Sequence, residues 1–171
     1  MVLLVLQRTS LALLVILLSY GTVSAQSTLF LVRHAERADT AAGAPPTMAA
    51  DPSLSEAGRA RAASLASMLK DAGVTAIFVT EFKRTQETAA PLAKALGLKP
   101  TIVRADDTAG LVAALKKISG NGHVVGHSNT VPDVIKALGV TSAVSIGDQD
   151  FDNLFIVTAG QPQRFVRLHY R

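Results

Sequence analysis

The stretch LFLVRHAER, Leu29–Arg37, combines a short apolar run with a dense group of charges. Its first four residues have the length and composition of a buried β-strand. Arg33 and His34 follow this run directly, and Glu36 and Arg37 come immediately after. Such a pattern has two interpretations: an ordinary solvated strand end, or a site that binds an anion such as phosphate. The residues that follow the other predicted strands decide between them.

The N-terminal segment resembles a secretory signal peptide. Arg8 is its only charge, residues 11–18 are continuously apolar, and residues 23–25 are small side chains at the spacing of a signal peptidase site. The alternative is an uncleaved membrane anchor, but a span needs about 20 mainly apolar residues, and polar residues interrupt this run. We therefore expect cleavage of residues 1–25, and one exported domain over 26–171, periplasmic or extracellular and free of the membrane after cleavage.

Composition excludes several classes of function. The chain has 171 residues, no cysteine and a net charge of +4 at pH 7. Without cysteine there are no disulfides, no thiolate nucleophile and no cysteine-based metal site. The lysines and arginines are dispersed, which is not the pattern of a nucleic-acid-binding surface. A domain of this size buries a substantial core by packing alone.

Strand-like and helix-like patterns alternate along the chain. The expected strands cover residues 28–32, 76–80, 101–103, 123–126, 153–158 and 163–170, and the expected helices cover 55–73, 84–97, 108–118 and 130–139. Ser55 and Thr108 are the predicted N-caps, and Pro91 is expected to bend the second helix or to begin it afresh. This order predicts an α/β fold, a three-layer α/β/α sandwich with a mainly parallel central sheet and an antiparallel C-terminal edge.

Polar side chains follow the predicted strands at the positions where open α/β sheets bind ligands. These residues are Arg33, His34, Glu81, Arg84, Asp106, Asp107, His127, Ser128 and Asn129. Two histidines, two arginines and several carboxylates are thereby expected at one edge of the sheet. This convergence is more informative than any single residue.

Phosphate chemistry suits this set of side chains. Two guanidinium groups bind phosphoryl oxygens in bidentate fashion and offset their charge. A neutral imidazole is a competent nucleophile toward phosphorus, and a second imidazole, if protonated, stabilises the equatorial oxygens. Some further group must protonate the leaving alcohol and later activate water.

Three motifs, LVRHAE (residues 31–36), TEFKRTQETA (80–89) and VVGHSNT (124–130), occur in the order and spacing typical of one family. The chain resembles the histidine phosphatase superfamily, which also contains the phosphoglycerate mutases, and its signal peptide is similar to that of the small exported members. The resemblance implies that His34 becomes phosphorylated. It also implies that Arg33 and Arg84 bind the phosphoryl group and that His127 completes the pocket.

The chain departs from the best-known family pattern in two respects. The first motif reads Arg-His-Ala where Arg-His-Gly is commoner, and no motif identifies the proton donor. The candidate donors are Asp106, Asp107, Glu81 and Glu36. A site without any dedicated acid is the remaining alternative, and it suits a substrate with a good leaving group such as phosphohistidine.

For several other polar residues, the sequence allows both a role in the site and a structural role. Arg37 is a third contact to phosphate or substrate, or it forms a salt bridge; Glu36 is a structural partner for an active-site arginine, or it takes part in the chemistry. Ser128 and Asn129 shape the turn after the fourth strand or contact the substrate. His123 is expected to be structural and His169 to lie at the surface.

The predicted function is an exported phosphomonoester hydrolase that acts on a small phosphorylated substrate through a phosphohistidine at His34. No cofactor is expected, and no metal, because two arginines would repel a cation and no compact ligand motif is present. The alternatives are a phosphohistidine protein phosphatase and a non-catalytic binder of phosphorylated envelope components. A mutase is disfavoured because the chain is short.

Overall fold

The computed structural model describes residues 27–38, 51–159 and 163–170. The predicted signal peptide, and most of the loop between the first strand and the first helix, lie outside these ranges. Within them, no helix is both long enough and apolar enough to cross a membrane.

A six-stranded sheet runs through the described residues. Its strands are β1 (Thr28–Arg33), β2 (Val74–Val79), β3 (Thr101–Ile102), β4 (Asn121–Gly126), β5 (Asn153–Thr158) and β6 (Arg164–His169). They lie side by side in the order β3-β2-β4-β1-β5-β6. The first four strands in chain order are parallel to one another, whereas β5 and β6 are antiparallel to their neighbours. The expected mainly parallel sheet with an antiparallel C-terminal edge is confirmed.

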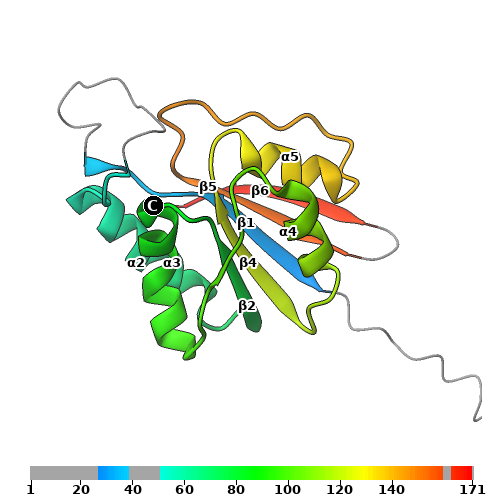
Figure 1. The fold of residues 1–171 in the computed structure, drawn as a ribbon, viewed down its shortest axis with the longest axis horizontal. Helices are drawn as coiled ribbons and strands as arrows, with labels where there is room; N and C mark the ends of the chain where they lie inside the picture. The colour runs from blue at the N-terminus through cyan, green and yellow to red at the C-terminus, as the bar shows by residue number, and fades with distance from the viewer. Residues whose placement is uncertain (1–26, 39–50, 160–162, 171) are drawn as a thin grey trace, which may run out of the picture.

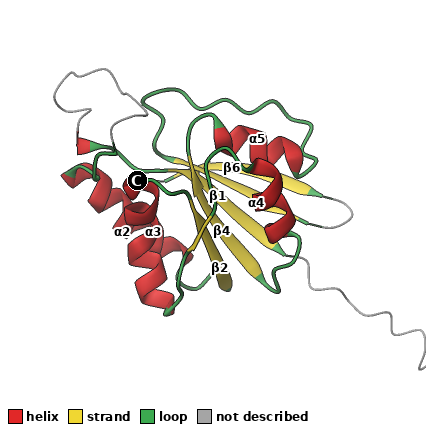
Figure 2. Cartoon of the chain, in the orientation of Figure 1, coloured by secondary structure: helices red, strands yellow, loops and turns green. Residues whose placement is uncertain are grey.

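Helices cover both faces of the sheet, as Figures 1 and 2 show. The pair α2 (Glu56–Leu69) and α3 (Lys83–Leu96) lies on one face, and the pair α4 (Thr108–Leu115) and α5 (Thr130–Ala137) lies on the other. Strand β1 supplies both cores, because alternate side chains point to opposite faces. Phe30 and Val32 pack with α2 and α3, while Leu29 and Leu31 pack with α4 and α5. Burial on both faces explains why this strand is continuously apolar.

Two details of the helices differ from the sequence predictions. Helix α3 is continuous through Pro91, so the alternative in which a helix begins afresh there is wrong. Its neighbours Leu92 and Ala93 are buried in the core, so packing holds the helix across the missing N–H. The N-cap of α4 is Asp107 and not Thr108, since the Asp107 carboxylate accepts from the Gly110 amide at 2.8 Å. The predicted cap at Ser55 is confirmed by its bond from the Gly58 amide at 3.0 Å.

The register of the parallel strands aligns the residues that follow them. Arg33 pairs with Gly126 between β1 and β4, and Val79 pairs with Val125 between β2 and β4. The next residue along β1 continues this ladder, because the His34 amide donates to the Gly126 carbonyl at 2.9 Å. The carboxyl ends of β1, β2 and β4 therefore present their following side chains together.

Candidate active site

His34 lies at the end of β1 with a ring whose tautomer its surroundings determine. Its Nδ1 is 2.8 Å from the Ala35 carbonyl oxygen, which only accepts hydrogen bonds. Nδ1 therefore carries the proton, and Nε2 carries the lone pair. Burial, followed by the nearby positive charges, lowers the pKa of His34 to about 3. The ring is thus a neutral imidazole with Nε2 in the form that a nucleophile requires.

His127 follows β4 and has the opposite tautomer. Its Nδ1 is 3.5 Å from an amino nitrogen of Arg84, and a guanidinium only donates. Nδ1 therefore accepts, and Nε2–H donates to the Thr80 hydroxyl at 3.0 Å. Burial and then the charge of Arg84 lower the pKa of His127 to about 3. The protonated second imidazole considered from the sequence is consequently not the form found in the free protein.

Arg84 is wholly buried, at 0% exposure, in the first turn of α3. Its guanidinium carbon lies 4.3 Å from the centroid of the Phe82 ring. The Asp51 carboxylate is 3.8 Å from Arg84 Nη1, but its closer contact is with the Lys83 amide at 2.8 Å. The helix start, an aromatic ring and a carboxylate together define where this guanidinium lies.

Arg33 is held by the connection between α5 and β5. Its Nη1 donates to the Gly147 carbonyl at 2.7 Å and to the Asp148 carbonyl at 3.0 Å. The guanidinium carbon lies 4.2 Å from the centroid of the Phe151 ring. Burial lowers the pKa of Arg33; among the smaller effects, the Asp148 and Asp150 carboxylates raise it and the charges of Arg37 and Arg84 lower it.

Arg37 belongs to the same positive cluster. It is 5% exposed and forms an isolated antiparallel bridge with Leu54. Its charge lowers the pKa of both Arg33 and His127. Three guanidiniums thus contribute positive charge around two neutral imidazoles, an arrangement that favours an anion.

The four candidate proton donors bind other groups. Glu36 forms a bidentate pair with Arg61 at 2.7–2.9 Å, so its partner is not one of the arginines predicted for the site. Glu81 accepts from the Ala105 amide at 2.9 Å.

The two aspartates lie on the connection to α4. Asp106 pairs with exposed Arg104, which lowers the pKa of Asp106, and Asp107 caps α4. Each of the four predicted donors therefore has a structural partner of its own in the described part of the chain.

The remaining predicted residues fall into two groups. Asn129 is exposed at the start of α5 without a side-chain cap bond, and Ser128 is half-buried beside it. It is Thr130 that accepts from the His127 amide, at 2.9 Å. His123 is fully buried and bonded to the Phe30 carbonyl at 3.1 Å, and exposed His169 pairs with Asp152 at 3.1 Å. The predictions that His123 is structural and that His169 lies at the surface are confirmed.

Sequence reasoning missed four residues that contact the site. Thr80 and Phe82 lie inside the second motif, which was a signal for both. Asp51 and Phe151 are distant from the motifs in sequence and carry no local signal. They reach the site only because the chain folds back over the sheet edge.

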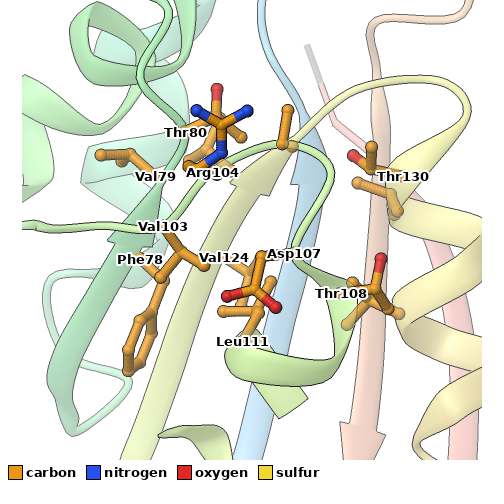
Figure 3. Close-up of a pocket in the computed structure, with 15 residues that line it drawn as sticks. Phe78, Val79, Thr80, Val103, Arg104, Asp107, Thr108, Leu111, Val124 and Thr130 are labelled. Atoms are coloured by element: carbon orange, nitrogen blue, oxygen red, sulfur yellow. The ribbon is translucent and has the colours of Figure 1, made fainter.

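A cavity of about 20 Å³ lies beside the site on the α4 and α5 face of the sheet (Figure 3). Thr80, Gly126 and Thr130 border it, whereas His34, Arg84 and His127 do not. Most of its lining is apolar, including Phe78, Val103 and Leu111. A space this small holds at most a water molecule or a methyl group, so it is a gap in the packing between the sheet and α4 and α5 and not the substrate site.

Comparisons with known proteins agree with this geometry. The sequence profile of the histidine phosphatase superfamily (branch 1) matches residues 29–114, which include the first two motifs. Among curated protein sequences, none matches this chain.

Solved structures share the fold at low identity. The structure titled mycobacterial hydrolase 1 is 15% identical, with a TM-score of 0.67, and the alignment covers 84% of this chain and 97% of that one. A mycobacterial glucosyl-3-phosphoglycerate phosphatase in complex with VO3 is 16% identical, with a TM-score of 0.65 and coverage of 82% and 97%. The protein histidine phosphatase SixA in complex with tungstate is 16% identical, with a TM-score of 0.62 and coverage of 83% and 96%.

The profile match spans half of the chain and contains His34, Arg33 and Arg84, the residues that the fold brings together with His127. The chain therefore belongs to the histidine phosphatase superfamily (branch 1) and is a phosphatase.

Proposed function

We propose that the protein hydrolyses phosphomonoesters through a phosphohistidine formed on Nε2 of His34. The observation that carries this proposal is the bond from His34 Nδ1 to the Ala35 carbonyl at 2.8 Å, which leaves Nε2 as the lone-pair nitrogen. The lowered pKa of His34, about 3, keeps that lone pair free at neutral pH.

The reaction has two displacements. In the first, the Nε2 lone pair forms a bond to phosphorus while the ester P–O bond breaks. The electron pair of the broken P–O bond leaves with the alcohol oxygen, which takes up a proton. Water then attacks the phosphorus, gives up a proton, and returns the N–P electron pair to Nε2 as phosphate departs. Arg33, Arg84 and Arg37 offset the charge of the phosphoryl oxygens in both steps, and the His127 ring forms one wall of the pocket.

A phosphohistidine protein phosphatase is the second candidate. The observation that favours it is that Glu36, Glu81, Asp106 and Asp107 all bind structural partners. A phosphoramidate nitrogen leaves more readily than an alkoxide, so its cleavage depends less on a dedicated acid. The dependence of kcat/KM on leaving-group pKa, measured over a series of aryl phosphates, separates the two candidates. A steep decline of kcat/KM with rising leaving-group pKa indicates that no acid protonates the leaving group, which favours the phosphohistidine phosphatase. A flat dependence indicates a dedicated acid, which favours the phosphomonoesterase.

Export belongs to the proposal as well. The apolar run of residues 11–18 and the small residues 23–25 support removal of residues 1–25 and delivery to the periplasm or the exterior. N-terminal sequencing of the protein recovered from a bacterial envelope fraction tests this, and an intact Met1 would contradict it.

The central experiment is to trap the phosphoenzyme. Wild type, His34→Ala and the surface control His169→Ala are mixed with p-nitrophenyl phosphate, quenched in alkali and weighed by mass spectrometry. We expect a phosphoryl adduct in wild type and His169→Ala and none in His34→Ala. If His34→Ala hydrolyses the substrate as fast as wild type does, the mechanism is overturned. If wild type binds ligands in competition with phosphate but hydrolyses none, the protein is a non-catalytic binder.

A further inference from the structure

The two arginines predicted to bind phosphate are each stacked on a phenylalanine. Arg33 lies 4.2 Å from the Phe151 ring centroid and Arg84 lies 4.3 Å from the Phe82 ring centroid. The two rings come from opposite sides of the site, since Phe82 precedes α3 and Phe151 precedes β5. The chain has only six phenylalanines and no tryptophan, yet two of the six occupy these positions.

The same two rings also contact the imidazoles. Phe151 lies 6.1 Å from the His34 ring and Phe82 lies 5.3 Å from the His127 ring, measured between centroids. Each arginine and histidine pair therefore shares one phenylalanine. Such an arrangement fixes the arginine relative to the imidazole of its own pair.

Arg61 shows how the same protein holds an arginine outside the site. Its guanidinium binds both carboxylate oxygens of Glu36 at 2.7–2.9 Å and donates to the Tyr170 carbonyl at 3.1 Å. A bidentate carboxylate fixes a guanidinium firmly but also neutralises it. Arg61 is consequently suited to structure and unsuited to binding an anion.

Arg33 is held without a bidentate carboxylate. Two neutral backbone carbonyls accept from its Nη1, and its buried Nε makes no hydrogen bond within the described residues. The negative face of the Phe151 ring attracts the guanidinium through its quadrupole and carries no net charge. The Asp148 and Asp150 carboxylates raise the pKa of Arg33, but neither forms an ion pair with it within the described residues. The ring therefore holds Arg33 without neutralising it, and its guanidinium remains suited to a phosphoryl group.

We propose that Phe82 and Phe151 are positioning residues that hold Arg84 and Arg33 by their ring faces and, unlike a bidentate carboxylate, orient them for phosphate without neutralising them. The inference rests on the proposed function, because it takes these arginines as the phosphate ligands. Neither ring takes part in the bond changes; each acts through its arginine. An apolar side chain of similar size without a ring fills the space but does not attract the cation.

The test measures anion binding and turnover separately. Wild type is compared with three leucine variants, Phe82→Leu, Phe151→Leu and the double variant of both. The comparison also includes the conservative Phe82→Tyr and the control Phe165→Leu on β6. Inorganic phosphate binding is followed by calorimetry, and kcat and KM are measured with p-nitrophenyl phosphate. A cation–π contact in a desolvated site corresponds to about tenfold in affinity, so we expect each leucine variant to bind phosphate about tenfold more weakly.

The pattern across variants identifies positioning. If the two rings act independently, the double variant loses about a hundredfold in phosphate affinity. Phe82→Tyr, which keeps the ring, is expected to bind phosphate within about twofold of wild type. The control Phe165→Leu is expected to bind phosphate as wild type does. KM is expected to rise with the phosphate dissociation constant. Leucine variants that bind phosphate like wild type, or a tyrosine variant no better than leucine, overturn the inference.

The failure of the inference and of the proposed function are distinguishable. One outcome supports the positioning role and contradicts the hydrolytic mechanism: wild type binds phosphate, the leucine variants bind it more weakly, and neither wild type nor any variant forms a phosphoenzyme. If wild type turns over through His34 and the leucine variants match it in both assays, the mechanism stands and the positioning role falls. A wild type that binds no phosphate contradicts both.

Discussion

The rings of His34 and His127 lie 5.4 Å apart, edge to face, and carry their protons on opposite ring nitrogens. Burial makes both rings neutral, since the pKa of each is lowered to about 3. The positive charge of the site at neutral pH therefore comes from its arginines. Binding of an anion is consequently independent of imidazole protonation over that range.

Replacing Thr80 by valine is expected to impair catalysis. The change keeps the shape of the side chain but removes the acceptor for His127 Nε2–H, which is 3.0 Å away. An unsatisfied buried donor costs about 1–3 kcal/mol, which corresponds to a loss of about 5-fold to 150-fold in kcat/KM. Thr75→Val on β2, the strand that ends just before Thr80, is the matched control, because its hydroxyl donates to the Ser119 carbonyl, away from the site. Unchanged kcat/KM in Thr80→Val would show that the His127 tautomer does not matter.

Replacing Glu36 by glutamine separates scaffold from chemistry. The Glu36–Arg61 pair is mostly buried, with side chains 19% and 22% exposed, so its loss should lower the free energy of unfolding by about 1–3 kcal/mol. Urea denaturation measures this loss, and Glu56→Gln, exposed in the first turn of α2, is the control. We expect kcat to stay within about twofold of wild type. A large fall in kcat with unchanged stability would instead identify Glu36 as the proton donor.

Buried His123 should contribute to a decline in the stability of the protein in mild acid, in addition to His34 and His127, whose pKa values are lowered as well. Complete burial lowers its pKa to about 4, from an ordinary value of 6.5. Between these values the unfolded chain binds a proton that the folded chain does not. The contribution of His123 is therefore complete above pH 6.5 and is lost as the pH falls to about 4, by up to about 3 kcal/mol.

A comparison of unfolding free energies at several pH values tests this dependence. His123→Gln removes the titrating ring, so its curve should be flatter than that of wild type between pH 6.5 and 4, whatever its absolute stability. His169→Gln, at an exposed position, is the control. Parallel curves for wild type and His123→Gln would contradict the prediction.

Filling the cavity between the sheet and α4 and α5 should stabilise the fold. Val103→Ile adds one methylene to the apolar lining of a space of about 20 Å³. Burial of one methylene contributes about 0.8 kcal/mol, which thermal or urea unfolding resolves. Val166→Ile on β6, where the side chain is 45% exposed, adds the same group outside the cavity and should have little effect. An equal or larger gain in Val166→Ile would show that the cavity is not the cause.

The sequence predicted the fold well because its main signals are local. The apolar run Leu29–Val32, the helix start at Ser55 and the alternation of strands and helices are properties of neighbouring residues, and all appear in the structure. The N-cap at Thr108 and the alternative of a helix that begins afresh at Pro91 were wrong because both outcomes depended on competing interactions. Core packing carries α3 past Pro91, and Asp107 is the better acceptor for the first amides of α4.

The sequence by itself determined which residues meet at the sheet edge. Parallel strands end together, so His34, Arg84 and His127 follow from strand order alone. The tertiary structure decided what each of them does there. The proton position on His127, the Phe151 ring against Arg33 and the pairing of Glu36 with Arg61 depend on contacts between segments remote in sequence. The His34 proton and the Phe82 ring against Arg84 depend on near neighbours in the chain, whose backbone conformation the fold sets. Charge and tautomer are properties of the surroundings, and only the folded chain supplies those surroundings.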